Sequence, residues 1–275
     1  ARQGALMNIV VVGGGPTGVE LAGALAEMKK YILPKDYPEL DFERMQVFLL
    51  EGSDRILSGM SPNASSKALN YLEKLDVQVR LKSLVTDFDG TIVTLKNGES
   101  ISANSLIWAA GISCPKLKGI PEDLYERGGR IQVNEFNEVE ALGSVFVLGD
   151  QAYMKEVGFE HGHPQVAQTA IQQARNLAKN FMNTKKGRPK KAFRYKDKGS
   201  LATVGRNLAV ADLPNIRFGG LLAWLVWMFV HLMSIVGVKN RLLIFVNWAW
   251  NYLTYDQSLR LLIKPSTKRK RQSAK

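Results

Sequence analysis

The sequence contains a single cysteine, Cys114, among its 275 residues. No disulfide can form within the chain, and a metal site built on paired cysteines is excluded. Histidine is also scarce: of three, His161 and His163 lie close together, but no third ligand follows them at metal-site spacing. The sequence therefore predicts no metal site, and the cysteine content is typical of a reducing compartment.

Acidic residues are nearly absent from the C-terminal part of the chain. Residues 216–275 contain ten lysines and arginines but one acid, Asp256, so nine of the twelve net positive charges lie there. The same segment contains four of the five tryptophans: Trp224, Trp227, Trp248 and Trp250. Basic residues beside a tryptophan-rich apolar sequence favour an anionic membrane surface, and not nucleic acid, as the partner.

Two apolar runs, residues 218–238 and 242–255, make up most of this segment. The first contains no formally charged residue and is long enough for a transmembrane helix, whereas the second is too short. His231, Ser234 and the tryptophans weaken the transmembrane alternative. The residues alone leave open a spanning helix, helices lying on the bilayer surface and a buried core hairpin.

The overall composition is that of a folded protein, with 45% hydrophobic and 23% charged residues. The chain enters a run typical of a buried strand within a few residues of Ala1. We therefore expect the sequence to begin inside a longer protein.

A strand, a glycine-rich turn and a helix are predicted near the start of the chain. Residues 9–12 form a β-branched run, and residues 19–27 are rich in alanine and leucine. Between them, Gly13, Gly15 and Gly18 form the pattern G-x-G-x-x-G. The first glycine permits a tight turn, the second lets a pyrophosphate approach the backbone, and the third lets the helix pack on the strand.

The surroundings of this turn favour a dinucleotide site over an ordinary structural turn. A second predicted buried strand, residues 47–50, ends directly before the acid Glu51. A phosphate on the turn would accept hydrogen bonds from the N–H groups at the exposed N-terminus of the helix. We assign the whole turn, including Gly14 and Thr17, to cofactor binding.

Two acids are candidates for contacts with the nucleotide. Glu51 lies where a carboxylate accepts hydrogen bonds from the adenosine ribose and repels a 2′-phosphate, so NADH should be preferred over NADPH. An expected surface excursion at residues 29–45 explains its distance from Gly18; the alternative is a solvated acid at a strand end. Glu20, expected in the first turn of the helix, either complements the helix macrodipole or points toward the nicotinamide.

The middle of the chain changes to a period of two. Residues 77–109 alternate between apolar and polar and contain two tight-turn signals, Asp89-Gly90 and Asn97-Gly98. They predict a small antiparallel meander that closes with a strand at residues 105–109. Further predictions along the chain are a strand at 145–148, a helix at 165–181 and a basic linker at 185–198.

Several segments together resemble a known family. Residues 11–23, 107–111 and 145–150 occur in the order and spacing of the pyridine-nucleotide flavoprotein reductases. Residues 164–173 resemble the A-Q-x-A-x-Q segment of one branch, the type II (non-proton-pumping) NADH:quinone oxidoreductases. Residues 247–255 resemble the membrane-anchoring tail of that branch.

The resemblance implies FAD and NADH as cofactors and a membrane quinone of the respiratory chain as the electron acceptor. Glu20 matches the family acid near the nicotinamide, and Asp150 matches the acid that binds the ribityl hydroxyls of the flavin. Gln168, Gln172 and Ala167 match the segment that passes the isoalloxazine at the quinone pocket. The remaining positions assigned to the cofactors are Ala110, Gly111 and Gly149.

Members of this family open with a flavin-binding G-x-G-x-x-G unit, whereas this chain contains one such pattern. We therefore expect it to lack the N-terminal flavin-binding half and to be inactive alone. The implied fold is α/β, with a Rossmann-like NAD domain and inserted meander at 1–112 and the C-terminal part of an FAD domain at 113–200. A membrane-anchoring region of amphipathic helices is expected at 201–275.

The resemblance favours monotopic helices that lie on a membrane, at its cytoplasmic face. A homodimer is compatible with the sequence, which does not fix the oligomeric state. Two alternatives remain: an NADH-binding module without catalytic activity, and a flavoprotein reductase with another acceptor. The thioredoxin reductase branch is excluded, because it requires a C-x-x-C pair and Cys114 stands alone.

Overall fold

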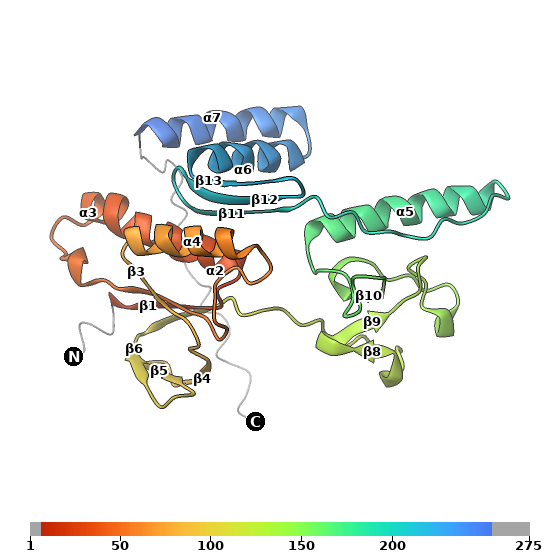
Figure 1. Ribbon diagram of the computed structural model, residues 1–275, viewed down its shortest axis with the longest axis horizontal. Helices are drawn as coiled ribbons and strands as arrows, with labels where there is room; N and C mark the ends of the chain where they lie inside the picture. The colour runs from red at the N-terminus through yellow and green to blue at the C-terminus, as the bar shows by residue number, and fades with distance from the viewer. Residues whose placement is uncertain (1–6, 255–275) are drawn as a thin grey trace, which may run out of the picture. The chain divides into compact units, whose positions relative to one another are not determined.

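The computed structural model describes residues 7–254. These residues form two compact units: unit 1 contains residues 7–109 and 200–254, and unit 2 contains residues 110–199. Unit 2 is the green part of the chain in Figure 1. The tail of residues 255–275, which carries much of the charge asymmetry, lies outside the described residues.

A four-stranded parallel sheet is the centre of unit 1. Its strands are ordered β3 (Val77–Arg80), β2 (Val47–Leu50), β1 (Ile9–Val12) and β7 (Ser105–Trp108). The two central strands consist of apolar residues because both faces of the sheet are covered. Val12, the last residue of β1, pairs with the last residues of both neighbours, so the three strands end at one edge.

Helices cover one face of this sheet. α2 (Pro16–Glu27) and α4 (Pro62–Lys74) bury their apolar sides against β1 and β2. α2 continues as a π-helical turn, η1 (Met28–Ile32), and a short helix, α3 (Leu33–Asp36). The surface excursion that we expected at residues 29–45 therefore begins later, after α3. Pro34 is tolerated because it lies in the first turn of α3, where a missing N–H costs no helical hydrogen bond.

The antiparallel meander covers the other face of the sheet. It consists of β4 (Val85–Phe88), β5 (Ile92–Leu95) and β6 (Ser100–Ser102), joined at the two predicted turns. Its apolar residues pack on the sheet in a second core. The meander is shorter than predicted, because the strands at both ends of residues 77–109 pair in the parallel sheet as β3 and β7.

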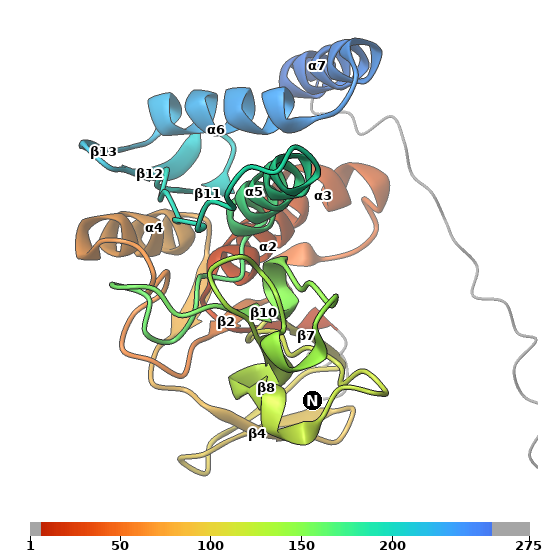
Figure 2. The same cartoon turned by 90° about the vertical axis from the view of Figure 1, so that its right-hand side faces the viewer.

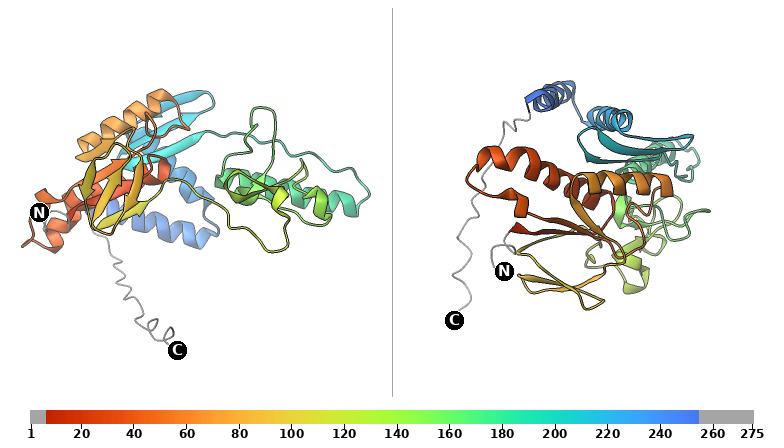
Figure 3. Two further views of the ribbon diagram at one scale, coloured as in Figure 1. Left: turned by 90° about the horizontal axis from the view of Figure 1, so that it is seen from below. Right: turned by 60° about the vertical axis from the view of Figure 1, so that its left-hand side comes forward.

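A second antiparallel sheet, which the sequence analysis did not predict, lies on α2 and α4. It is formed by β11 (Ser200–Gly205), β12 (Leu208–Leu213) and β13 (Ile216–Gly219). Ala202, Val204 and Val210 of β11 and β12 belong to the same core as the two helices. The right panel of Figure 3 shows this sheet above the red and orange helices.

Two further helices, α6 (Leu221–Ser234) and α7 (Val238–Thr254), follow this sheet. α6 packs on β12 through Ala223, its one buried residue, and Figure 2 shows α7 above α6. The apolar run at 218–238 is therefore not one helix: it starts inside β13 and breaks after Ser234. Among residues 7–254, no helix combines the length and apolar character required to cross a membrane.

Unit 2 combines a small sheet with one long helix. The sheet is ordered β10 (Ala152–Tyr153), β9 (Arg130–Gln132) and β8 (Tyr125–Glu126), and the helix is α5 (Ala167–Lys185). Short 3₁₀ turns are η2 (Phe42–Arg44) in unit 1 and, in unit 2, η3 (Glu122–Leu124), η4 (Arg127–Gly129), η5 (Glu140–Leu142) and η6 (Gly149–Gln151).

Two predictions for unit 2 were wrong in detail. Residues 145–148 do not form a strand, and Phe146 makes one isolated bridge with Glu138. The basic segment after α5 is not a free linker, because its backbone pairs with side chains of the helix. The Asn180 side chain, for example, donates to the Lys191 carbonyl and accepts its N–H, both at 2.9 Å.

Candidate functional site

The glycine-rich turn connects the end of β1 to α2. Gly13 has a φ of +109°, a conformation that favours glycine. A Cβ atom on Gly18 would lie 1.8 Å from the Gly13 carbonyl oxygen, so only glycine fits where the helix crosses the turn. Both positions thus require glycine for the geometry of the turn itself.

Gly15 has a different role in the turn. It is the N-cap of α2, and Pro16 follows at the first helical position. A Cβ atom on Gly15 would meet nothing within 4 Å, so the space beside this residue is open. Thr17 is exposed next to it. The turn therefore presents free N–H groups and the positive end of the helix dipole to a space that can receive a phosphate.

The Glu51 carboxylate lies against the same turn. One oxygen accepts the N–H of Gly14 at 2.5 Å, and the other accepts the N–H of Ser53 at 2.7 Å. Burial alone would raise the pKa of Glu51, but hydrogen bonds from Ser53, Gly14 and Gly52 outweigh it and hold the pKa below its usual value. Glu51 is therefore an anion fixed beside the turn, and not a solvated strand-end acid.

Gly14 also requires its small size. A Cβ atom there would lie 2.9 Å from the Glu51 carboxylate and 2.9 Å from a methyl group of Ile56. The Gly14 carbonyl accepts the N–H of Leu57 at 2.7 Å. The loop after β2 and the glycine turn after β1 thus form one structure at the carboxyl edge of the parallel sheet, where nucleotides bind in such folds.

Glu20 lies on the side of α2 that faces β11 and α6. Its carboxylate accepts the N–H of Thr203 at 3.3 Å, and Trp227 and His231 of α6 face it. Burial raises the pKa of Glu20, and these three partners oppose the increase. The first turn of α2 contains no acid, so the macrodipole alternative for Glu20 was wrong.

In unit 2, the backbone around Asp150 is fixed while its side chain is exposed. The Asp150 carbonyl accepts the side-chain amide of Gln165 at 3.1 Å and the thiol of Cys114 at 3.3 Å. Gly149 has a φ of +69°, and a Cβ atom on it would lie 3.1 Å from that of Ala170 in α5. An exposed carboxylate on a rigid turn is suited to hold hydroxyl groups of a ligand.

Gln173, which the sequence analysis did not select, fixes this turn from the other side. Its side-chain oxygen accepts the N–H of Gly149 at 2.7 Å, and the residue is 0% exposed. The signal was present in the sequence: the buried stripe of α5 follows helical spacing and contains Thr169, Gln173, Leu177 and Asn180. A glutamine in such a stripe requires a buried hydrogen-bond partner.

The two glutamines expected at the quinone pocket bind the backbone of the segment after α5. Gln172 donates to the Lys196 carbonyl at 2.9 Å and accepts its N–H at 3.1 Å. Gln168 donates to the Gly199 carbonyl at 3.2 Å, and its oxygen is buried without a donor within residues 7–254. Both side chains therefore lie on one face of α5, as their spacing predicts.

The remaining selected residues lie at chain turns of unit 2. Ala110 and Gly111 are exposed, and Gly111 has a φ of +92°. Ala167, the first residue of α5, is also exposed. Backbone groups at these positions are thus accessible.

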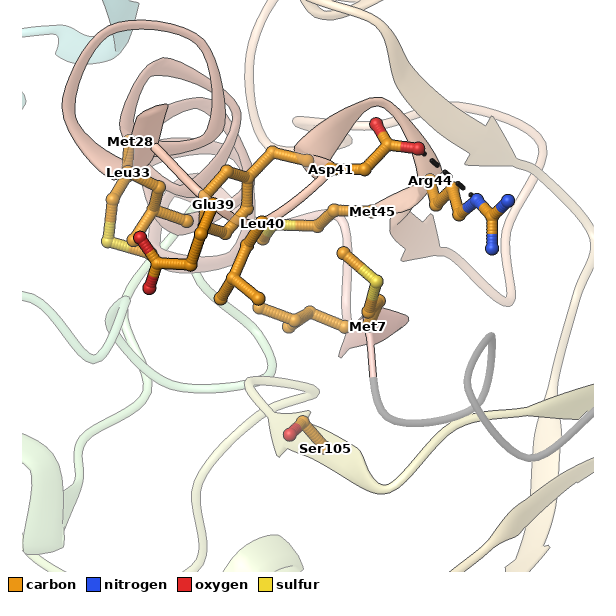
Figure 4. Close-up of a pocket in the computed structure, with 11 residues that line it drawn as sticks. Met7, Met28, Leu33, Glu39, Leu40, Asp41, Arg44, Met45 and Ser105 are labelled. Carbon is orange, nitrogen blue, oxygen red and sulfur yellow. Dashed lines mark ion pairs between the residues drawn. The ribbon is translucent and has the colours of Figure 1, made fainter. Parts of the chain in front are cut away.

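An apolar cavity of about 540 Å³ lies at the opposite end of β1. Figure 4 shows three methionines around it, Met7, Met28 and Met45, with the Asp41–Arg44 ion pair at its rim. Ile9 and Ser105, the first residues of β1 and β7, also line it. Because it is at the amino edge of the sheet, it is separated from the glycine turn by the length of β1.

Family models match two parts of the chain. The model described as "Pyridine nucleotide-disulphide oxidoreductase" matches residues 2–174. The model described as "NDH2 C-terminal domain" matches residues 198–255, which contain the antiparallel sheet, α6 and α7.

Among curated proteins, the chain is similar to the type II NADH:quinone oxidoreductases Ndh and NdhA of Mycobacterium tuberculosis. It is 33% identical to Ndh over 264 residues, which cover 92% of this chain and 56% of that protein. It is 34% identical to NdhA over 260 residues, which cover 90% and 54%. The chain thus spans about half the length of the curated relatives it matches.

Among solved structures, the fold matches NDH2 from Plasmodium falciparum in complex with NADH. The TM-score is 0.82 at 20% identity, covering 92% of this chain and 67% of that one. A reduced CoADR-RHD of Bacillus anthracis matches with a TM-score of 0.55 at 22% identity, covering 74% of this chain and 34% of that one. These likenesses describe the fold.

Proposed function

Because the chain belongs to the pyridine nucleotide-disulphide oxidoreductase family, we propose that it is part of an FAD-dependent NADH:quinone oxidoreductase. The observation that carries the proposal is the fixed anion Glu51 beside the open N-terminus of α2. This arrangement offers donors to a pyrophosphate and an acceptor to a ribose within one loop structure. The names of the relatives and the match of the C-terminal family model support a quinone as the acceptor.

In unit 1, each part of the turn has a distinct task toward NADH. Gly15 admits the pyrophosphate, Gly13 and Gly18 set the path of the backbone, and Gly14 holds Glu51 in place. Glu51 then accepts ribose hydroxyls and disfavours a 2′-phosphate. Glu20 orients the nicotinamide end through its position on α2.

The residues of unit 2 fit the ribityl part of a flavin. Asp150 offers an exposed carboxylate on a turn whose backbone is held by the side chains of Gln173, Gln165 and Cys114. When bound, FAD supplies the chemistry of accepting a hydride from NADH and passing two electrons to the quinone. Two further positions, Ala110 and Gly111, have exposed backbone groups that could contact such a group. Gly149 provides the tight turn before Asp150.

On the quinone side, α5 supplies the polar face that contains Gln168 and Gln172. Both side chains are held by backbone groups of residues 196–199, so their orientation is fixed before a ligand arrives. Ala167 is small and leaves room at the start of the helix. These residues would orient the quinone ring and exclude water from it.

The exposed apolar residues of α6 and α7 suit a membrane surface. They include Leu222, Phe229 and Val230 on α6 and Leu242, Phe245 and Leu253 on α7, all largely exposed. These exposed apolar residues gather on two consecutive helices, and Lys239 and Arg241 lie in the first turn of α7. We infer a monotopic attachment in the plane of the bilayer interface, at the cytoplasmic face.

The test is NADH oxidation by the FAD-loaded enzyme that contains this chain, reconstituted in vesicles with a quinone. Oxidation that depends on the quinone, and loss of bound flavin in Asp150→Ala, are expected. If NADH binds tightly but no quinone-dependent oxidation occurs, the proposed activity is wrong and the NADH-binding module is favoured. If Asp150→Ala retains its flavin, the flavin assignment is wrong.

A further inference from the structure

Gln173 occupies a position that packing alone would give to leucine. It lies between Thr169 and Leu177 on the buried stripe of α5 and is 0% exposed. Only one of the two polar atoms of its amide is used: the oxygen accepts the N–H of Gly149 at 2.7 Å, whereas the nitrogen has no acceptor within residues 7–254. Burying an amide nitrogen without an acceptor costs free energy of folding. A glutamine at this position therefore indicates that the hydrogen bond of its oxygen has a role.

The hydrogen bond that Gln173 makes controls a residue in the left-handed region. Gly149 has a φ of +69°, and its Cα faces Ala170, which lies one turn before Gln173 on α5. Without an acceptor, the buried N–H of Gly149 would favour another conformation of the turn, and the direction of the next residue, Asp150, would change with it. The Gln173 bond therefore selects one direction for the Asp150 side chain.

Two other groups hold Asp150 from the opposite side. Gln165 and Cys114 both donate to its carbonyl. The backbone on both sides of the Asp150 side chain is thus fixed by side chains from α5 and from the loops around it. The carboxylate itself has no partner of this kind among the hydrogen bonds and ion pairs described for residues 7–254.

We propose that Gln173 is the positioning residue that fixes the Asp150 carboxylate for the flavin ribityl hydroxyls. The inference rests on the proposed function, because it requires Asp150 to bind the flavin. Gln173 also directly follows Gln172 on α5, so neighbouring residues of one helix serve the proposed flavin site and the proposed quinone site. Gln173 acts through Gly149 and does not touch the flavin.

The decisive comparison is between variants that keep or lose the acceptor oxygen. Gln173→Leu and Gln173→Met lose it at similar volume, whereas Gln173→Glu keeps it. Flavin affinity of the holoenzyme, measured by fluorescence after removal and readdition of FAD, should fall about fivefold or more in the apolar variants. Gln173→Glu should bind flavin within about twofold of the unsubstituted enzyme. Asn176→Leu, which removes a different α5 side-chain bond, is the matched control and should be neutral.

Two measurements separate a positioning role from a general loss of structure. Hydrogen exchange of the Gly149 amide should accelerate in Gln173→Leu and Gln173→Met and stay slow in Gln173→Glu, with or without flavin. In an Asp150→Ala background, Gln173→Leu should cause no further loss of flavin affinity.

The outcomes distinguish the two proposals. If Asp150→Ala weakens flavin binding but Gln173→Leu and Gln173→Met do not, the inference about Gln173 is overturned and the flavin assignment stands. Equal loss in Gln173→Glu and Gln173→Leu also overturns it, as does an additive effect in the Asp150→Ala background. If Asp150→Ala itself leaves flavin affinity unchanged, the flavin assignment fails and the role of Gln173 with it.

Discussion

The Glu51 carboxylate accepts the backbone N–H of Gly14 at 2.5 Å, although 37 residues separate them in the sequence. The contact joins the loop after β2 to the turn after β1, and the amide of Ser53 holds the second carboxylate oxygen. The acid that we expect to select the nucleotide thus also holds the turn that we propose as its binding site. Its charge and its position are fixed by the same hydrogen bonds.

Glu51 should determine the preference for NADH. A carboxylate here gains a hydrogen bond to the ribose and repels a 2′-phosphate, a difference of roughly tenfold or more in affinity for one charged hydrogen bond. We expect NADPH to have a higher dissociation constant than NADH, and Glu51→Gln should lower the ratio of the two constants, measured by calorimetry. Asp54→Asn, an exposed acid in the same loop, is the control. Equal affinities for the two nucleotides in the unsubstituted protein would contradict the assignment.

The glycines of the turn should separate into structural and ligand-facing positions. Gly18→Ala places a Cβ atom 1.8 Å from the Gly13 oxygen and should lower Tm strongly or prevent folding. Gly15→Ala meets nothing within 4 Å, so Tm should change little, yet NADH affinity should fall at least tenfold because the pyrophosphate approaches there. A Gly15→Ala protein that binds NADH normally would show that the phosphate lies elsewhere.

Glu20 should make the stability of unit 1 depend on pH. Burial raises its pKa above the usual 4.5, against the Thr203 amide, His231 and Trp227. A raised pKa contributes stability below the unfolded pKa, and that contribution is lost as pH rises through the folded pKa. Glu20→Gln should therefore raise Tm at pH 7, on the order of 2 °C, and give no gain near pH 4.

Thermal unfolding at the two pH values checks this prediction. Glu73→Gln, on the exposed side of α4, is the matched control and should change Tm at neither pH. At each pH the measured quantity is the change in Tm that Glu20→Gln causes. If this change is more negative at pH 7 than at pH 4, the ionised carboxylate stabilises the fold and the prediction is wrong.

Gln168 and Gln172 should affect the quinone step more than the nicotinamide step. Their amides are oriented toward residues 196–199, and alanine would remove that polar face of α5. In single-turnover measurements, both alanine variants should slow quinone reduction more than flavin reduction by NADH. Equal slowing of the two steps would indicate a change in flavin binding instead.

The exposed face of α6 and α7 should control attachment to lipid. Phe229→Ser combined with Leu242→Ser should reduce flotation with anionic vesicles, because each removes apolar area from an interfacial helix. Val157→Ser, at an apolar residue 93% exposed in unit 2, is the control and should float normally. High salt should release only part of the bound protein, since apolar burial is not screened. Complete release by salt would exclude an apolar attachment.

Local signals determined the nucleotide half of the fold and the family. The β-branched run before Gly13, the glycine spacing and the apolar strand before Glu51 act over a few residues each, so they are readable without the fold. The resemblance to pyridine-nucleotide flavoprotein reductases was confirmed by the family model over residues 2–174. The turn signals at Asp89-Gly90 and Asn97-Gly98 were also correct, because a glycine at positive φ lies in each turn and this is a local requirement.

Only the tertiary structure decided which strands pair and which polar groups meet. The sequence placed β3 and β7 in the meander, but they pair with β2 and β1 in the parallel sheet, and such pairing is a long-range choice. The sheet β11–β13 was missed because its alanines are weak strand formers. In the structure, Gly23 of α2 lets the helix approach the backbone of β11 at Val204. The bonds from Glu51 to Gly14 and from Gln173 to Gly149 join distant segments, and no local pattern specifies such contacts.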